Sequence, residues 1–105
     1  MITNESKNAL NFLETILEKK PTLGDFILSI RQGEEMTQAE FSKILGISRH
    51  NLCDIEHNRR FVSPKMAALF ANKLGYSEKQ FVRLCLQDML NRDGLALRVD
   101  IENAA

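Results

Sequence analysis

Hydrophobic residues recur every three or four positions along most of the chain, which is the spacing of one face of an α-helix. Polar capping residues, glycines and prolines separate these stretches. Three stretches open with a Thr or Ser followed three residues later by an acid or amide, the pattern of a capping box. The pattern predicts helices over residues 5–20, 22–32, 37–45, 48–57, 63–74 and 77–93. We therefore expect an all-α fold.

The last residues follow a different period. From residue 95, apolar and polar side chains alternate, which is typical of a half-buried β-strand, and the apolar members are Leu95, Leu97, Val99 and Ile101. A lone strand cannot complete its backbone hydrogen bonds inside a helical domain. The simplest solution is pairing with the same strand of a second copy across a twofold axis, so we expect a dimerisation element. A disordered or helical tail is the alternative.

Composition narrows the class of protein. The chain has 105 residues, of which 44% are hydrophobic and 27% charged, as expected for one compact domain. No apolar run approaches the ~20 residues that span a bilayer, and a secretory signal is missing, so we expect a cytoplasmic protein without a membrane partner. A Gly-rich phosphate loop and a nucleophile beside a histidine are also missing, which argues against an enzyme.

The two cysteines do not predict a cofactor or a disulfide framework. Cys53 and Cys85 are far apart in the sequence, and a reducing compartment disfavours a bridge. Cys53 and His57 are four residues apart on a predicted helix, a spacing that can share a metal. Two ligands are too few for a structural zinc site, so we expect no metal and no other cofactor.

Charge is unevenly distributed, although the net charge is zero. Residues 43–73 contain six basic and two acidic side chains, whereas residues 22–42 contain one basic and four acidic side chains. Such a segment can form a basic face on a neutral protein, as a nucleic-acid partner requires. A solvated mixed surface is the alternative.

The window from Gln38 to His57 fits a helix-turn-helix for steric reasons. Two short helices cross through a tight turn, where Gly46 supplies a left-handed backbone. The close crossing needs a small residue in the first helix, and Ser42 is in that place. The side chains expected to point inward are Phe41, Leu45, Ile47, Leu52 and Ile55.

The stretch MTQAEFSKILGISRHNLCDIEHNRR, followed by Ser63-Pro64, resembles the Cro/cI-type helix-turn-helix family of phage repressors, bacterial regulators and antitoxins. The resemblance covers about residues 22–90. It implies a lambda-repressor-like five-helix domain that acts as a homodimer on inverted-repeat operators of double-stranded DNA. Serine replaces the commonest alanine at Ser42, and asparagine replaces a frequent glycine at Asn58; both substitutes suit their positions.

The predicted organisation has three parts. Residues 1–21 form an additional amphipathic helix, residues 22–94 form the DNA-binding domain with its motif at 37–58, and residues 95–105 form the dimerisation strand. The family pattern does not require the first and last parts.

The second motif helix is expected to enter the major groove with its N-terminal side chains at the base edges. The candidate base-reading residues are Ser48, Arg49, His50 and Asn51, with Asp54 one turn later. Arg49 can pair with O6 and N7 of guanine, and Asn51 can read adenine. Ser48 is also an N-cap, which is its first role.

Asp54 is the exception, because phosphates repel an acid. It either accepts from a cytosine amino group or orients Arg49 or Arg60 by an ion pair. The candidate phosphate-binding residues are Gln38, Lys43, Arg59, Arg60 and Lys65. Glu56 is expected to pair with a neighbouring basic residue, and His57 and Asn58 to end the helix.

These features predict a sequence-specific transcriptional regulator, with repression as the expected outcome. The alternative is an antitoxin that neutralises a small toxin protein and represses its own operon. The N-terminal helix and the tail motivate this alternative, since the motif needs neither. A helix over residues 5–20 that only covers the core would remove part of that motivation.

Overall fold

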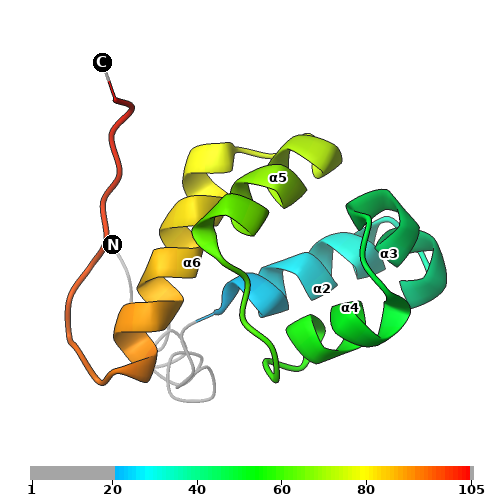
Figure 1. Ribbon diagram of the computed structural model, residues 1–105, viewed down its shortest axis with the longest axis horizontal. Coiled ribbons are helices and arrows are strands. Elements are labelled where there is room, and N and C mark those ends of the chain that lie inside the picture. Colours follow the sequence, from blue (N-terminus) through cyan, green and yellow to red (C-terminus); the bar gives the residue numbers. More distant parts are fainter. Residues whose placement is uncertain (1–20, 105) are drawn as a thin grey trace, which may run out of the picture.

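The computed structural model describes residues 21–104, and five helices and no strand occur in that range. The helices are α2 (Leu23–Gly33), α3 (Gln38–Leu45), α4 (Arg49–Glu56), α5 (Pro64–Leu74) and α6 (Glu78–Arg92). Figure 1 shows α3 and α4 at one end of the molecule and α6 at the other, with α2 running between them. The all-α prediction is confirmed for this range. The helix predicted over residues 5–20 lies outside the described residues.

Each helix begins where the capping pattern predicts. The N-caps, whose side-chain oxygens accept a backbone N–H of the first turn, are Thr22, Thr37, Ser48, Ser63 and Ser77. Thr22 and Thr37 form complete capping boxes with Asp25 and Glu40. The third predicted box is incomplete, because Ser77 accepts from the Gln80 N–H and within residues 21–104 the Gln80 side chain returns no bond.

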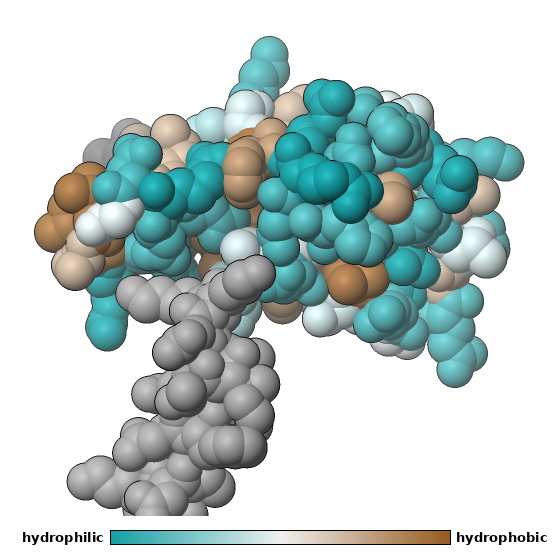
Figure 2. All heavy atoms as spheres, turned by 90° about the horizontal axis from the view of Figure 1, so that it is seen from below, coloured by the Kyte–Doolittle hydropathy of each residue, from teal (hydrophilic) through white to brown (hydrophobic). Residues whose placement is uncertain are grey.

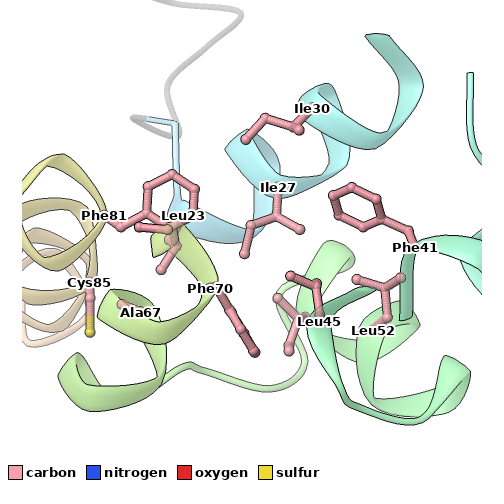
Figure 3. Close-up of a cluster of buried hydrophobic side chains, with 12 residues drawn as sticks. Leu23, Ile27, Ile30, Phe41, Leu45, Leu52, Ala67, Phe70, Phe81 and Cys85 are labelled. Carbon is pink, nitrogen blue, oxygen red and sulfur yellow. The ribbon is translucent and has the colours of Figure 1, made fainter. Parts of the chain in front are cut away.

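The core forms where the five helices meet (Figure 3). Phe41, Phe70 and Phe81 are its largest members, and aliphatic side chains of α2, α3 and α4 fill the space between them. Helix α2 passes so close to α4 that a Cβ at Gly24 would collide with the carbonyl oxygen of Ile55. Glycine is therefore required at this crossing for steric reasons.

The β-strand predicted at Leu95–Ile101 is not formed by the single chain, and residues 95–104 contain neither helix nor strand. They run along the outside of α6, on the side away from α4 (Figure 1). A strand needs a second backbone edge, and within residues 21–104 the segment meets the rest of the chain only through the Leu95 N–H, which donates to the Leu90 carbonyl, and through the side chain of Gln87, at Leu97 and Val99. We call residues 95–104 the tail.

Within the described range, the longest helix has 15 residues, and none is long and apolar enough to cross a bilayer.

Candidate nucleic-acid interface

Helices α3 and α4 form the predicted helix-turn-helix. Gly46 ends α3 in the left-handed conformation with φ of 74°, and the Ile47 N–H returns to the Ser42 carbonyl at 3.0 Å. Ser42 is only 4% exposed, as expected of a small residue at the crossing. Of the five residues predicted to point inward, all are buried except Ile47, which is half-buried.

A buried carboxylate lies beneath the motif. The side chain of Glu56 is 0% exposed and accepts three hydrogen bonds: from Arg31 Nε at 2.6 Å, Arg31 Nη2 at 3.1 Å and Gln38 Nε2 at 2.9 Å. The prediction that Glu56 pairs with a basic residue is confirmed, and the partner comes from α2. These bonds join α2, α3 and α4 at one point, which fixes the angle between the motif helices.

The same network reaches the surface through Gln38. Because its Nε2 donates to Glu56, its Oε1 faces the other way and lies 3.4 Å from Arg49 Nη1. Gln38 was predicted to bind phosphate through its amide, and in the free chain one of its two N–H groups is engaged inside the protein. The contact to Arg49 is long, so Arg49 is oriented by it and is not immobilised.

The first turn of α4 presents the predicted base-reading residues to solvent. Ser48, Arg49 and His50 are exposed, and Asn51 is half-buried. The Ser48 hydroxyl accepts the Asn51 N–H at 3.0 Å, so its first role is the N-cap, as predicted. The opposite edge of this short helix carries Leu52 and Ile55 into the core, which gives the exposed turn a rigid base.

Asp54 is paired, but not with the partners predicted for it. Its carboxylate accepts from Arg59 Nε at 2.9 Å, whereas an ion pair with Arg49 or Arg60 was one of the two roles predicted for it. The chain folds back after Asn58, and the N–H groups of Arg59 and Arg60 both reach the Asp54 carbonyl, at 2.8 and 3.2 Å. This turn places the Arg59 side chain over Asp54, and their hydrogen bond holds the pKa of Asp54 below its usual value.

His50 adds a second cationic partner when protonated, since its Nε2 lies 3.4 Å from Asp54 Oδ2. The acid on the exposed face of α4 is therefore neutralised within the protein. Arg59, predicted to bind phosphate, already has its guanidinium on Asp54 and at 3.5 Å from Cys53 Sγ.

The other basic candidates belong to the elements before and after α4 in the chain. Lys43 is in the last turn of α3, Arg60 lies in the loop after α4, and Lys65 is the second residue of α5; all three are exposed. Lys73 belongs to the same basic segment, but its Nζ donates to the Leu45 carbonyl at 3.2 Å. It satisfies the end of α3, as a cation at a helix C-terminus can.

Cys53 and His57 lie together, as their spacing predicts, with Sγ 3.6 Å from Nδ1. The same Nδ1 is 2.8 Å from the Cys53 carbonyl oxygen. Within residues 21–104, no group of three or more His, Cys, Asp or Glu residues is placed to hold a metal ion.

Sequence reasoning missed the structural role of Asn58. Its φ of 59° is the left-handed conformation expected of a residue that ends a helix. Its side chain also accepts from Thr22 Oγ1 at 2.6 Å and donates to Asp25 Oδ1 at 3.0 Å, which ties the end of α4 to the capping box of α2. The asparagine signalled a helix end, but its partners are 33 and 36 residues away in sequence.

Comparison with known proteins agrees with this geometry. The model of the helix-turn-helix domain family matches residues 24–85, which is more than half of the chain and includes α3 and α4. No curated protein and no solved structure matches the chain. In a helix-turn-helix, the second helix is the one that enters the DNA major groove. By its sequence and by the arrangement of its helices, the chain belongs to the helix-turn-helix domain family.

Proposed function

We propose that the chain is a sequence-specific transcriptional regulator of the Cro/cI type that binds an inverted-repeat operator as a homodimer and represses transcription. One observation carries the proposal. The first turn of α4 exposes Arg49 and His50, while Leu52 and Ile55 on its other edge are buried. A rigid helix whose free edge carries hydrogen-bonding side chains suits insertion into a major groove.

Arg49 is the principal base-reading residue in this proposal. Its guanidinium can donate two hydrogen bonds to O6 and N7 of guanine. A cation at a helix N-terminus is electrostatically disfavoured, so the fold itself provides no reason for arginine there. The long contact with Gln38 orients Arg49 before binding and is weak enough to be exchanged for a base. Asn51 and His50 read adjacent positions, and Ser48 contributes its free O–H.

Asp54 reads a cytosine amino group while Arg59 neutralises its charge. An ionised acid would otherwise be repelled by the phosphates. The phosphate contacts come from Lys43, Arg60 and Lys65, whose side chains are exposed, and from the second amide N–H of Gln38. These contacts position the protein without reading sequence.

Selection of bound sites from random DNA tests the whole proposal. We expect inverted repeats whose half-sites are about 10 base pairs, or a multiple of that, apart from centre to centre. A promoter that overlaps the selected site should be silenced by the chain in a reporter assay. Recovery of unrelated sequences, or of single half-sites alone, would contradict the reading role or the homodimer respectively.

Arginine substitutions then distinguish residues that read bases from residues that bind phosphates. Arg49→Ala should weaken binding to the selected site by about 1–3 kcal/mol and affect random DNA less, because a base contact is lost. Arg60→Ala should weaken both sequences alike and lower the salt slope by about 1. Lys79→Ala at the exposed start of α6 is the control, and fluorescence anisotropy at several salt concentrations is the measurement. An equal loss on both DNAs for Arg49→Ala would remove its base-reading role.

A further inference from the structure

One edge of the tail is hydrogen-bonded to a side chain in the way that it would be bonded to a neighbouring strand. Gln87 of α6 donates through Nε2 to the Leu97 carbonyl at 2.7 Å and accepts through Oε1 from the Val99 N–H at 2.8 Å. A carbonyl and the N–H two residues later lie on the same edge of an extended chain. The amide of Gln87 thus occupies the edge that a neighbouring strand would use.

The other edge of the tail is open. In an extended chain, the backbone groups of Arg98 and Asp100 point away from those of Leu97 and Val99. Within residues 21–104, no hydrogen bond reaches the backbone N–H or C=O of Arg98 or Asp100. An open edge of this kind is a template for a second strand.

The sequence of this segment is complementary to itself when reversed. Leu97-Arg98-Val99-Asp100-Ile101 reads apolar, positive, apolar, negative, apolar. In an antiparallel pair centred on Val99, Leu97 lies opposite Ile101 of the second copy, and Arg98 lies opposite Asp100. Every cross-strand pair is then apolar or oppositely charged, and such pairs stabilise a sheet.

Other registers are worse. A pair centred on Arg98 places two arginines opposite each other, and one centred on Asp100 places two aspartates opposite each other, which is destabilising. A pair centred on Leu97 sets Arg98 opposite Ala96 and leaves both charges without a partner. The Val99 register also agrees with Gln87, because Val99 becomes a non-hydrogen-bonded pair and Arg98 and Asp100 exchange the hydrogen bonds.

Exposed apolar side chains also favour a second copy of the chain as the partner of the tail. Leu97 is 58% exposed and Leu95 46%, and Figure 2 shows apolar atoms gathered at the left edge of the molecule, where the tail lies in Figure 1. Leu97 lines a groove of about 610 Å³ together with Phe26 and Leu84. Exposed apolar side chains beside a groove mark an interaction surface.

We propose that two copies dimerise through antiparallel pairing of residues 97–101 in the register centred on Val99, with Arg98 of each copy opposite Asp100 of the other. The inference rests on the homodimer of the proposed function and specifies its interface. Ile101 of the second copy then covers Leu97 at the groove. The pairing leaves α4 uncovered, because the tail is on the far side of α6 (Figure 1).

Charge reversal tests the register in the full chain. Arg98→Asp and Asp100→Arg should each raise the dimer Kd on the order of tenfold, because each creates two like-charge pairs per dimer. The double variant should restore the wild-type Kd, and an equimolar mixture of the two single variants should form heterodimers. Sedimentation equilibrium measures all four. A double variant as weak as the single ones would overturn the register.

Cysteine cross-linking provides a second measurement that does not depend on charge. Val99→Cys should form a disulfide-linked dimer under mild oxidation, since the Cα atoms of a non-hydrogen-bonded pair are about 4.5 Å apart. Leu97→Cys is the control, because its own counterpart in the second copy would lie about 13 Å away. Cys53 and Cys85 are present in both variants. Equal cross-linking of the two variants would overturn the register.

The homodimer and the register of its strand pairing can be disproved independently. A wild-type chain that stays monomeric in sedimentation, with or without its selected operator, would contradict the proposed homodimer. If the chain is dimeric but its dimer Kd is unchanged in every charge-reversal variant, the register is wrong and the proposed homodimer stands. DNA binding to an isolated half-site should be unchanged in both charge variants, which confirms that the domain is folded.

Discussion

Helix α2 is held at its two ends by two buried carboxylates with different surroundings. Near its C-terminus, Arg31 donates two hydrogen bonds to Glu56 of α4, and Gln38 donates a third. At its N-terminus, the Leu23 N–H donates a single hydrogen bond, at 2.9 Å, to Asp88 of α6, which is 8% exposed. The first carboxylate has a cationic partner in direct contact, whereas within residues 21–104 the second has none.

The two buried acids differ in the groups that satisfy them. Burial raises the pKa of Asp88, and the Leu23 N–H and the more distant Arg92 only partly oppose that effect. At Glu56, three donated hydrogen bonds satisfy a carboxylate that has no access to solvent. The junction beneath the motif is therefore held by an ion pair with three hydrogen bonds, whereas we expect the stability of the junction with α6 to depend on pH.

Removing Glu56, the carboxylate beneath the helix-turn-helix, should lower the free energy of unfolding most. Glu56→Ala should lower the free energy of unfolding by about 3 kcal/mol, because it leaves the half-enclosed Arg31 guanidinium and the Gln38 amide without their acceptor. Urea unfolding followed by circular dichroism measures the loss. Glu102→Ala in the exposed tail is the matched control and should stay within about 0.5 kcal/mol of the wild type. A comparable loss in both variants would contradict the special role of the buried pair.

The second-largest loss of unfolding free energy is expected where α2 crosses α4, at Gly24. Gly24→Ala should cost about 2–3 kcal/mol, because the added methyl meets the Ile55 carbonyl and forces α2 away from α4. Gly33→Ala is the control, since nothing lies within 4 Å of a Cβ there and alanine favours a helix. The same unfolding assay applies. If Gly24→Ala behaved like Gly33→Ala, the close approach of α2 to α4 would be wrong.

The smallest effect is expected at Asp88, and it appears as a pH dependence. The pKa of Asp88 is raised in the folded state, so the folded state binds the proton more tightly than the unfolded state. The contribution of Asp88 to stability is then greatest below the unfolded pKa of about 3.9 and declines as pH rises through the folded pKa. Asp88→Asn should remove this decline while its amide oxygen keeps the Leu23 N–H bond.

Urea unfolding between pH 4 and 7 measures the unfolding free energy of the wild type and of the Asp88→Asn variant. The difference in unfolding free energy should shift in favour of the Asn variant as pH rises. Asp54 and Glu40, whose pKa values are lowered by their hydrogen bonds, contribute an opposite slope in both chains and cancel in the difference. Parallel pH profiles would show that Asp88 is not the group that makes the α6 junction pH-dependent.

Local signals in the sequence predicted most of the fold. Thr22, Thr37, Ser48 and Ser63 begin helices because each side chain accepts from the backbone N–H only three positions later. Gly46 ends α3 because a left-handed residue is needed there. These interactions lie within one helical turn, so the sequence alone reveals them.

The partners of the charged side chains could not be predicted in the same way. Asp54 was expected to pair with Arg49 or Arg60, but the turn after Asn58 brings Arg59 to it. Glu56 was expected to find a basic neighbour, and the partner proved to be 25 positions away on α2. Which of several available arginines approaches an acid depends on the turn that follows α4 for Asp54, and on how α2 and α4 cross for Glu56.

By itself, the sequence determined the number and ends of the helices from α2 to α6, the small residue at the motif crossing and the exposed first turn of α4. It did so because capping and amphipathic spacing act over a few residues. Only the tertiary structure decided that Gln38 connects buried Glu56 to Arg49, and that Gln87 occupies one edge of the tail and leaves the other open. Those facts depend on distances between helices, which arise only when the core closes.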